Sequence, residues 1–96
     1  MIGVVAQLKV KEGGQDGFEA AAKKLVAAVN ANEPGCKLYQ LFKVQESATD
    51  YVFMEQYENQ AAVDAHRASD HFKTLGAAMG PFLDGRPVII RTDIVE

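Results

Sequence analysis

Hydrophobic and polar residues alternate over the first ten positions of the chain, which is the pattern of a β-strand with one buried face. The buried face is predicted to consist of Ile2, Val4, Ala6, Leu8 and Val10. Beyond Gly13 and Gly14 the apolar spacing changes to three and four residues, which indicates an amphipathic helix. Its apolar stripe is formed by Phe18, Ala22, Leu25 and Val29. The sequence Asn-Glu-Pro-Gly at 32–35 should end this helix, because proline cannot continue it and glycine turns easily.

The middle of the chain predicts a β-hairpin followed by two helices. The hairpin strands are Cys36–Gln45 and Tyr51–Tyr57, joined by the polar loop 46–50. Asn59 and Ser69 are placed to cap the two helices, because their side chains can accept backbone hydrogen bonds. The apolar positions of these helices are Ala62, Val63, Phe72, Leu75 and Met79. A β-branched run then predicts a last strand over Val88–Val95.

The order strand, helix, strand, strand, helices, strand is that of one ferredoxin-like βαββαβ unit. We therefore expect an α+β fold with a four-stranded antiparallel sheet and helices on one face. The 96 residues suffice for a single domain, residues 1–96, and not for two.

The hairpin strands are apolar on both faces, whereas a sheet with one wet face should alternate apolar with polar residues. In the first strand one face carries Leu38, Phe42 and Val44 and the other carries Tyr39 and Leu41. In the second strand Val52 and Met54 face one way, and Tyr51, Phe53 and Tyr57 face the other. Helices can cover only one of these faces. Because large exposed apolar patches are rare on monomers, we expect a homodimer whose sheets pack face to face.

Composition narrows the possible partners and locations. A net charge of −3 with scattered basic residues gives no support to nucleic-acid or membrane binding. A single cysteine, Cys36, excludes an intrachain disulfide and favours a reducing compartment. The N-terminus lacks the basic region of a signal peptide, so the expected location is cytoplasmic. No phosphate loop or dinucleotide fingerprint is present, so no flavin, haem or other cofactor is expected.

Both histidines, His66 and His71, fall in the segment that links the two later helices, and histidine is the usual acid or base near neutral pH. Their spacing of five does not place them on one face of a continuous helix, and no metal-ligand motif accompanies them. A bend at Ser69 would put His66 in a last turn and His71 in a first turn. Because a helix N-terminus favours the neutral ring, His71 is predicted to be the base and His66 its electrostatic partner. The alternative is that both merely cap helices at the surface.

One carboxylate, Glu55, interrupts an otherwise apolar strand. If buried, it could orient a histidine or accept a substrate hydroxyl; otherwise it lies at a sheet edge or a dimer contact. An apolar pocket between helices and sheet is expected to hold the ligand. Its predicted substrate-binding residues are Tyr39, Phe53, Glu55, Tyr57 and Phe72.

These residues together resemble the antibiotic biosynthesis monooxygenase family. The resemblance is carried by Glu33-Pro34-Gly35-Cys36, Tyr39, Phe53, Glu55, Tyr57, His66, Ser69, His71 and Phe72. It implies a dimeric α+β barrel that oxidises a quinol or polyphenol-like aromatic with O₂ and without metal or prosthetic group. Haem-degrading relatives use an asparagine, a tryptophan and a histidine. The corresponding positions here hold Ala6, His66 and Gly76.

Two other functions stay open at this point. Some relatives isomerise small phosphorylated signalling sugars, and such an enzyme would need a phosphate anchor, for which Arg67, Lys73 and Arg86 are candidates. A non-enzymatic ligand-binding dimer would instead have a pocket without titratable groups.

Overall fold

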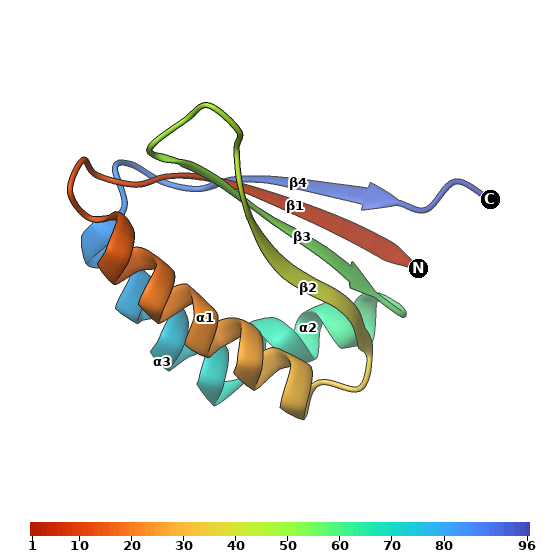
Figure 1. Cartoon of the computed structure of the whole chain (residues 1–96). Helices are drawn as coiled ribbons and strands as arrows, with labels where there is room; N and C mark the ends of the chain where they lie inside the picture. Colours follow the sequence, from red (N-terminus) through yellow and green to blue (C-terminus); the bar gives the residue numbers. More distant parts are fainter.

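The strands predicted from the sequence pair into one antiparallel sheet in the order β2-β3-β1-β4. The computed structural model describes all of residues 1–96. Figure 1 shows the helices gathered on one side of the sheet, as the ferredoxin-like βαββαβ order requires. The strands are β1 (Ile2–Lys9), β2 (Cys36–Lys43), β3 (Asp50–Tyr57) and β4 (Val88–Asp93). The helices are α1 (Gln15–Asn32), α2 (Gln60–Ala68) and α3 (Asp70–Met79), followed by a 3₁₀ turn at Gly80–Phe82.

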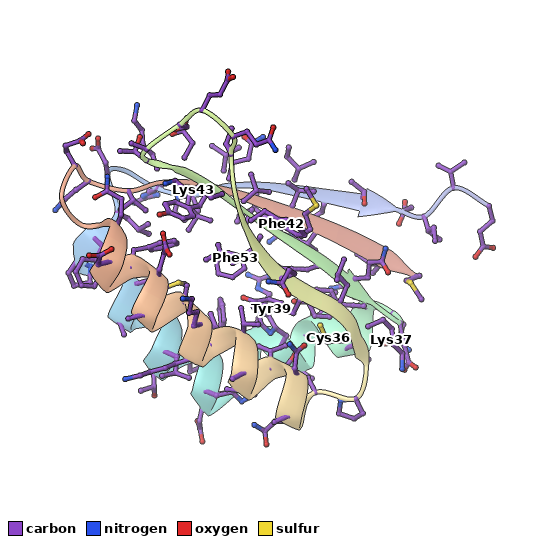
Figure 2. The ribbon with its side chains drawn as sticks, viewed as in Figure 1. Cys36, Lys37, Tyr39, Phe42, Lys43 and Phe53 are labelled. Carbon is purple, nitrogen blue, oxygen red and sulfur yellow. The ribbon has the colours of Figure 1, made fainter.

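The core lies between the sheet and α1, and the alternation and helical spacing in the sequence predicted it correctly. All four residues of the α1 stripe are buried, and they pack against alternate residues of β1. Tyr39 and Phe53 extend this core from the hairpin, with ring centroids 5.2 Å apart. Figure 2 shows both side chains in the space between the sheet and the helices. Burial of this apolar surface is the main force that holds the two layers together.

Two predicted caps shape the link between α2 and α3. The Asn59 side chain accepts a hydrogen bond from the backbone N–H of Ala62 at 3.0 Å, and Ser69 accepts one from Phe72 at 3.2 Å. Ser69 also donates to the carbonyl oxygen of His66 at 2.7 Å. Ser69 therefore ends α2 and starts α3, and the predicted bend separates His66 from His71.

Several strands are shorter than the sequence predicted. β1 ends at Lys9, and Val10 makes only an isolated bridge to Leu83. β2 ends at Lys43, two residues early, and the following loop contains Glu46 with a φ of 66°. β4 ends at Asp93 instead of Val95, although the N–H of Ile94 still donates to the carbonyl oxygen of Met1 at 3.2 Å.

The sheet face away from the helices is apolar and uncovered in the single chain. Its exposed residues are Leu38, Phe42, Val44, Met54, Val88 and Ile90. β4 is exposed along its whole length, on the helix side as well, so one edge of the helix-facing surface is open. None of the helices combines the length and hydrophobicity that a membrane span requires.

Candidate functional site

The loop between α1 and β2 approaches α2 closely, and Gly35 makes this approach possible. A Cβ atom at Gly35 would lie 2.8 Å from the Cβ of Ala62, closer than carbon atoms pack. The predicted Asn-Glu-Pro-Gly helix end thus places the residue after α1, Glu33, beside the link between α2 and α3. An acidic group and both histidines meet there.

The Glu33 carboxylate bridges the two histidines. Nδ1 of His66 lies 3.0 Å from both of its oxygens, and Nε2 of His71 lies 2.5 Å from Oε2. The side chains of His66 and Glu33 are 5% and 10% exposed, whereas that of His71 is 21% exposed. The three groups form a charged cluster that is largely shielded from water.

This contact sets the proton position on His66. A carboxylate only accepts hydrogen bonds, so the neutral His66 ring carries its proton on Nδ1 and presents Nε2 as an acceptor. Nε2 has no partner within the chain and is not fully enclosed. It is therefore free to accept a proton from a ligand, in the arrangement by which an acidic residue orients a histidine base.

Aromatic rings surround His66 and remove water from it. Its ring centroid lies 4.4 Å from that of Phe72, 5.2 Å from that of Tyr39 and 5.5 Å from that of Tyr57. Burial lowers the pKa of His66 below its usual 6.5, and the contact with Glu33 opposes this only in part. Desolvation therefore opposes the charged form, which a position in a last helical turn would favour through the helix dipole.

His66 lies in the wall of a pocket of about 280 Å³ between the sheet and helices α2 and α3. The pocket is lined by Val4, Glu55, Tyr57, Val63, His66, Arg67, Phe72, Ile89 and Arg91. Of the predicted site residues, Glu55, Tyr57, His66 and Phe72 share this wall. Tyr39 and Phe53 do not line it, because they are buried in the core beside it. His71 lies beyond Glu33, in a separate hollow.

Glu55 is a buried carboxyl group without a cationic partner. It is 9% exposed and lies on β3, an interior strand of the sheet, so it is not at a sheet edge. Its side chain points to the helix side, so it does not lie on the outer sheet face, where a partner chain could contact it. The hydroxyl of Tyr57 donates a hydrogen bond to its Oε1 at 2.6 Å. Burial raises the pKa of Glu55 to about 7, while this hydrogen bond lowers it. The pocket thus holds a carboxyl group that titrates near neutral pH and a histidine ring that burial favours in its neutral form.

Several residues of the site carry no signal in the sequence. Glu33 belongs to the motif of the family resemblance, but nothing local marks it as the partner of both histidines, and no local signal marks Ile89 or Arg91. Among the candidate phosphate anchors only Arg67 lines the pocket, and Arg86 lines a different hollow. No three His, Cys, Asp or Glu side chains are arranged to hold a metal ion.

Comparison with known proteins identifies a family for the chain. The family model described as "Antibiotic biosynthesis monooxygenase" matches residues 1–78. The Bacillus subtilis protein YcnE, whose name refers to a monooxygenase, is 29% identical over the full length of both chains.

Solved structures extend the likeness to the whole fold. A crystal structure from Caulobacter crescentus CB15, whose description names the same family, is 45% identical with a TM-score of 0.95, covering 99% of this chain and 90% of that one. A conserved protein from Methanosarcina mazei Go1 is 27% identical with a TM-score of 0.89, covering 95% of this chain and 89% of its own.

Proposed function

Because this chain belongs to the antibiotic biosynthesis monooxygenase family, we propose that it is a cofactor-independent monooxygenase that oxidises a quinol or related phenol with O₂. The observation that carries the proposal is the buried Glu33–His66 pair, in which His66 lines the pocket and its Nε2 has no partner within the chain. A base must be neutral to accept a proton, and burial keeps His66 neutral. Glu33 holds the ring in the required tautomer.

In the proposed reaction His66 takes the phenolic proton, and the chemistry then follows from the electron-rich phenolate. The phenolate gives one electron to O₂, and the two radicals combine into a C–O bond at a ring carbon. Loss of the hydrogen on that carbon as a proton breaks the O–O bond. One oxygen atom remains as a quinone carbonyl, and the other leaves as water, which takes up both the proton held by His66 and the proton lost from the ring carbon. One phenol and one O₂ give one quinone and one water, so no added reductant is needed.

The other pocket residues suit this chemistry. Phe72, Val63 and Val4 provide apolar walls that hold an aromatic ring and keep water from the intermediates. Glu55 can hydrogen-bond a second oxygen of the substrate, in its neutral or its charged form. In this arrangement His71 touches Glu33 and not the ligand, so it is a positioning residue.

We further propose that two chains associate through the outer faces of their sheets. The exposed fractions of Phe42, Met54 and Ile90 are 44%, 42% and 43%, and such residues from β2, β3 and β4 would share one apolar patch. A twofold dimer would cover this patch and leave the helix-side pocket accessible.

One observation favours a second candidate, the isomerase of a small phosphorylated sugar. Arg67 lines the same pocket as His66, so a phosphate anchor and a proton-transfer group lie together. A purely ligand-binding dimer is less well supported, since its pocket should lack titratable groups and this one contains Glu55 and His66.

Oxygen consumption tests the proposed monooxygenase. The protein is incubated aerobically with a panel of quinols, and uptake is compared with buffer and with the Glu58→Gln variant, an exposed residue outside the site. Turnover under ¹⁸O₂ should place one labelled oxygen atom in the product and one in water. Absence of uptake above the buffer rate for every quinol would contradict the proposal.

A further inference from the structure

Two arginines in the pocket wall have no partner within the chain. Arg67 comes from the last turn of α2, and Arg91 comes from β4. Neither side chain makes a hydrogen bond to any other residue, and the ion pairs of the structure involve only Lys37, His66 and His71 as cations. Each guanidinium therefore keeps its full set of donors for a ligand.

The acidic residues nearby do not neutralise these arginines. Glu55 shares a row of the sheet with Arg91, since Val4 of β1 pairs with both, yet no ion pair joins them. A guanidinium beside a carboxylate lowers its pKa, whereas the pKa of Glu55 is raised. Asp93, two residues along β4 from Arg91, makes no ion pair either.

The resulting charge distribution contrasts with that of the whole molecule. The chain has a net charge of −3, but this pocket carries two guanidinium groups, a neutral His66 and a carboxyl group that is protonated in part at pH 7. The pocket wall is therefore positive, which concentrates anions and disfavours cations.

We infer that the substrate carries an acidic substituent, a carboxylate, which Arg67 and Arg91 bind at the open side of the pocket while its reacting hydroxyl contacts Nε2 of His66. This inference rests on the proposed monooxygenase function, which it extends by naming the substrate as a carboxylated phenol. Arginine suits this role because its planar fork matches a carboxylate with two parallel hydrogen bonds. The apolar wall of Val63 and Phe72 would hold the aromatic ring between the two polar ends.

Binding without turnover separates this inference from the oxygenase reaction. Isothermal titration calorimetry under anaerobic conditions compares benzene-1,4-diol with 2,5-dihydroxybenzoate, which differ only in the carboxylate. The wild-type protein should bind the carboxylated compound at least about tenfold more tightly, as expected for a charge-assisted contact. This preference should fall in Arg67→Gln and in Arg91→Gln and disappear in the double variant.

The controls use residues outside the pocket and a second anion. Arg86→Gln removes an arginine of a different hollow and should keep the preference. Both pocket arginines are exposed, so their substitution should not impair folding.

Equal binding of the two compounds to wild type, or a preference that survives in the double variant, would overturn the inference. Tighter arginine-dependent binding of inorganic phosphate than of 2,5-dihydroxybenzoate would overturn it too, in favour of a phosphorylated substrate. Oxygen uptake is measured separately, so either result can fail alone.

Discussion

Glu33 and His66 are 33 residues apart in the sequence, yet a carboxylate oxygen of Glu33 accepts a hydrogen bond from Nδ1 of His66 at 3.0 Å. The contact joins the end of α1 to the end of α2 and is largely buried. It leaves Nε2 of His66 as the one ring nitrogen that a ligand in the pocket can reach. Its consequences can be measured in several ways.

Replacing the histidines separately should distinguish the proton acceptor from the positioning residue. His66→Ala removes the group in the pocket and should lower kcat/KM for a reactive quinol by about 10²–10⁴-fold, the usual contribution of a general base. His71→Ala should lower it less than about tenfold, because His71 lies beyond Glu33. A larger loss in His71→Ala, the order that the helix-dipole argument predicted, would reverse these roles.

The Glu33→Gln substitution should change the pH dependence of activity. Activity needs neutral His66 and therefore falls as the pH decreases through the pKa of His66, which burial holds below 6.5. The contact with Glu33 raises this pKa. Loss of the contact should therefore move the acid limb, the low-pH side of the activity profile, to lower pH. The glutamine amide can also donate to Nδ1 and permit the wrong tautomer, which should lower the maximal rate. An NMR titration of the His66 ring provides the direct measurement.

The control for this experiment is Glu58→Gln, which removes an exposed carboxylate from a surface ion pair with Lys37. It should leave both the acid limb and the His66 titration unchanged. An unaltered acid limb in Glu33→Gln would show that Glu33 does not govern the proton affinity of His66.

Glu55 should make the protein less stable at high pH. Its pKa is raised from 4.5 to about 7, so its contribution to the free energy of unfolding is full below pH 4.5 and is lost as the pH rises through 7. Glu55→Gln keeps an acceptor for Tyr57 and removes this dependence. The free energy of unfolding of the variant minus that of wild type should therefore rise by up to about 3 kcal/mol between pH 4 and pH 8.

Urea unfolding at the two pH values measures this gain. The comparison between variant and wild type cancels the opposite effect of His66, whose lowered pKa costs stability as the pH falls below 6.5. If the unfolding free energies of variant and wild type change by the same amount between the two pH values, Glu55 does not titrate in this range.

The exposed sheet face should make the protein dimeric. Light scattering at micromolar concentration is expected to give twice the chain mass of 10.4 kDa, for an interface of at least about 1,000 Å² in total. Phe42→Asp places a charge on this face and should shift the mass toward the monomer. Ala20→Asp, on the exposed side of α1, is the matched control and should stay dimeric. A monomer mass for the wild type would contradict the proposed association.

The fold was predictable because its signals are local. Alternation in β1, the three-and-four spacing in α1 and the caps at Asn59 and Ser69 each lie within a few residues, and all are present in the structure. Strand ends were less accurate, since they depend on backbone pairing with a neighbouring strand and not on the residue pattern alone. The pairing of β4 with β1 covers Val88 to Asp93, whereas the β-branched pattern continues to Val95.

The site was predictable only in part, because its geometry is tertiary. The residue types pointed to His66 and Glu55, but the Glu33 contact depends on how closely Gly35 approaches Ala62. The protonation state of His66 depends on the aromatic rings that bury it, and its position in the helix does not reveal these contacts. In the sequence Arg91 is one polar residue within a β-branched strand. Only the pairing of β4 with β1, which sets Arg91 opposite Val4, places it in the pocket wall.

The open edge strand β4 has a consequence for how this scaffold can diversify. The family match ends at residue 78, before β4 begins at Val88, yet β4 supplies Ile89 and Arg91 to the pocket. The base and its carboxylate come from the matched part of the chain, and one wall of the pocket does not. In the proposed function β4 therefore contributes Arg91 to ligand binding, while Arg67 and the proposed base His66 come from α2. An engineer could exchange the strand for that of a relative and retarget the pocket, while the proton-transfer machinery stays in place.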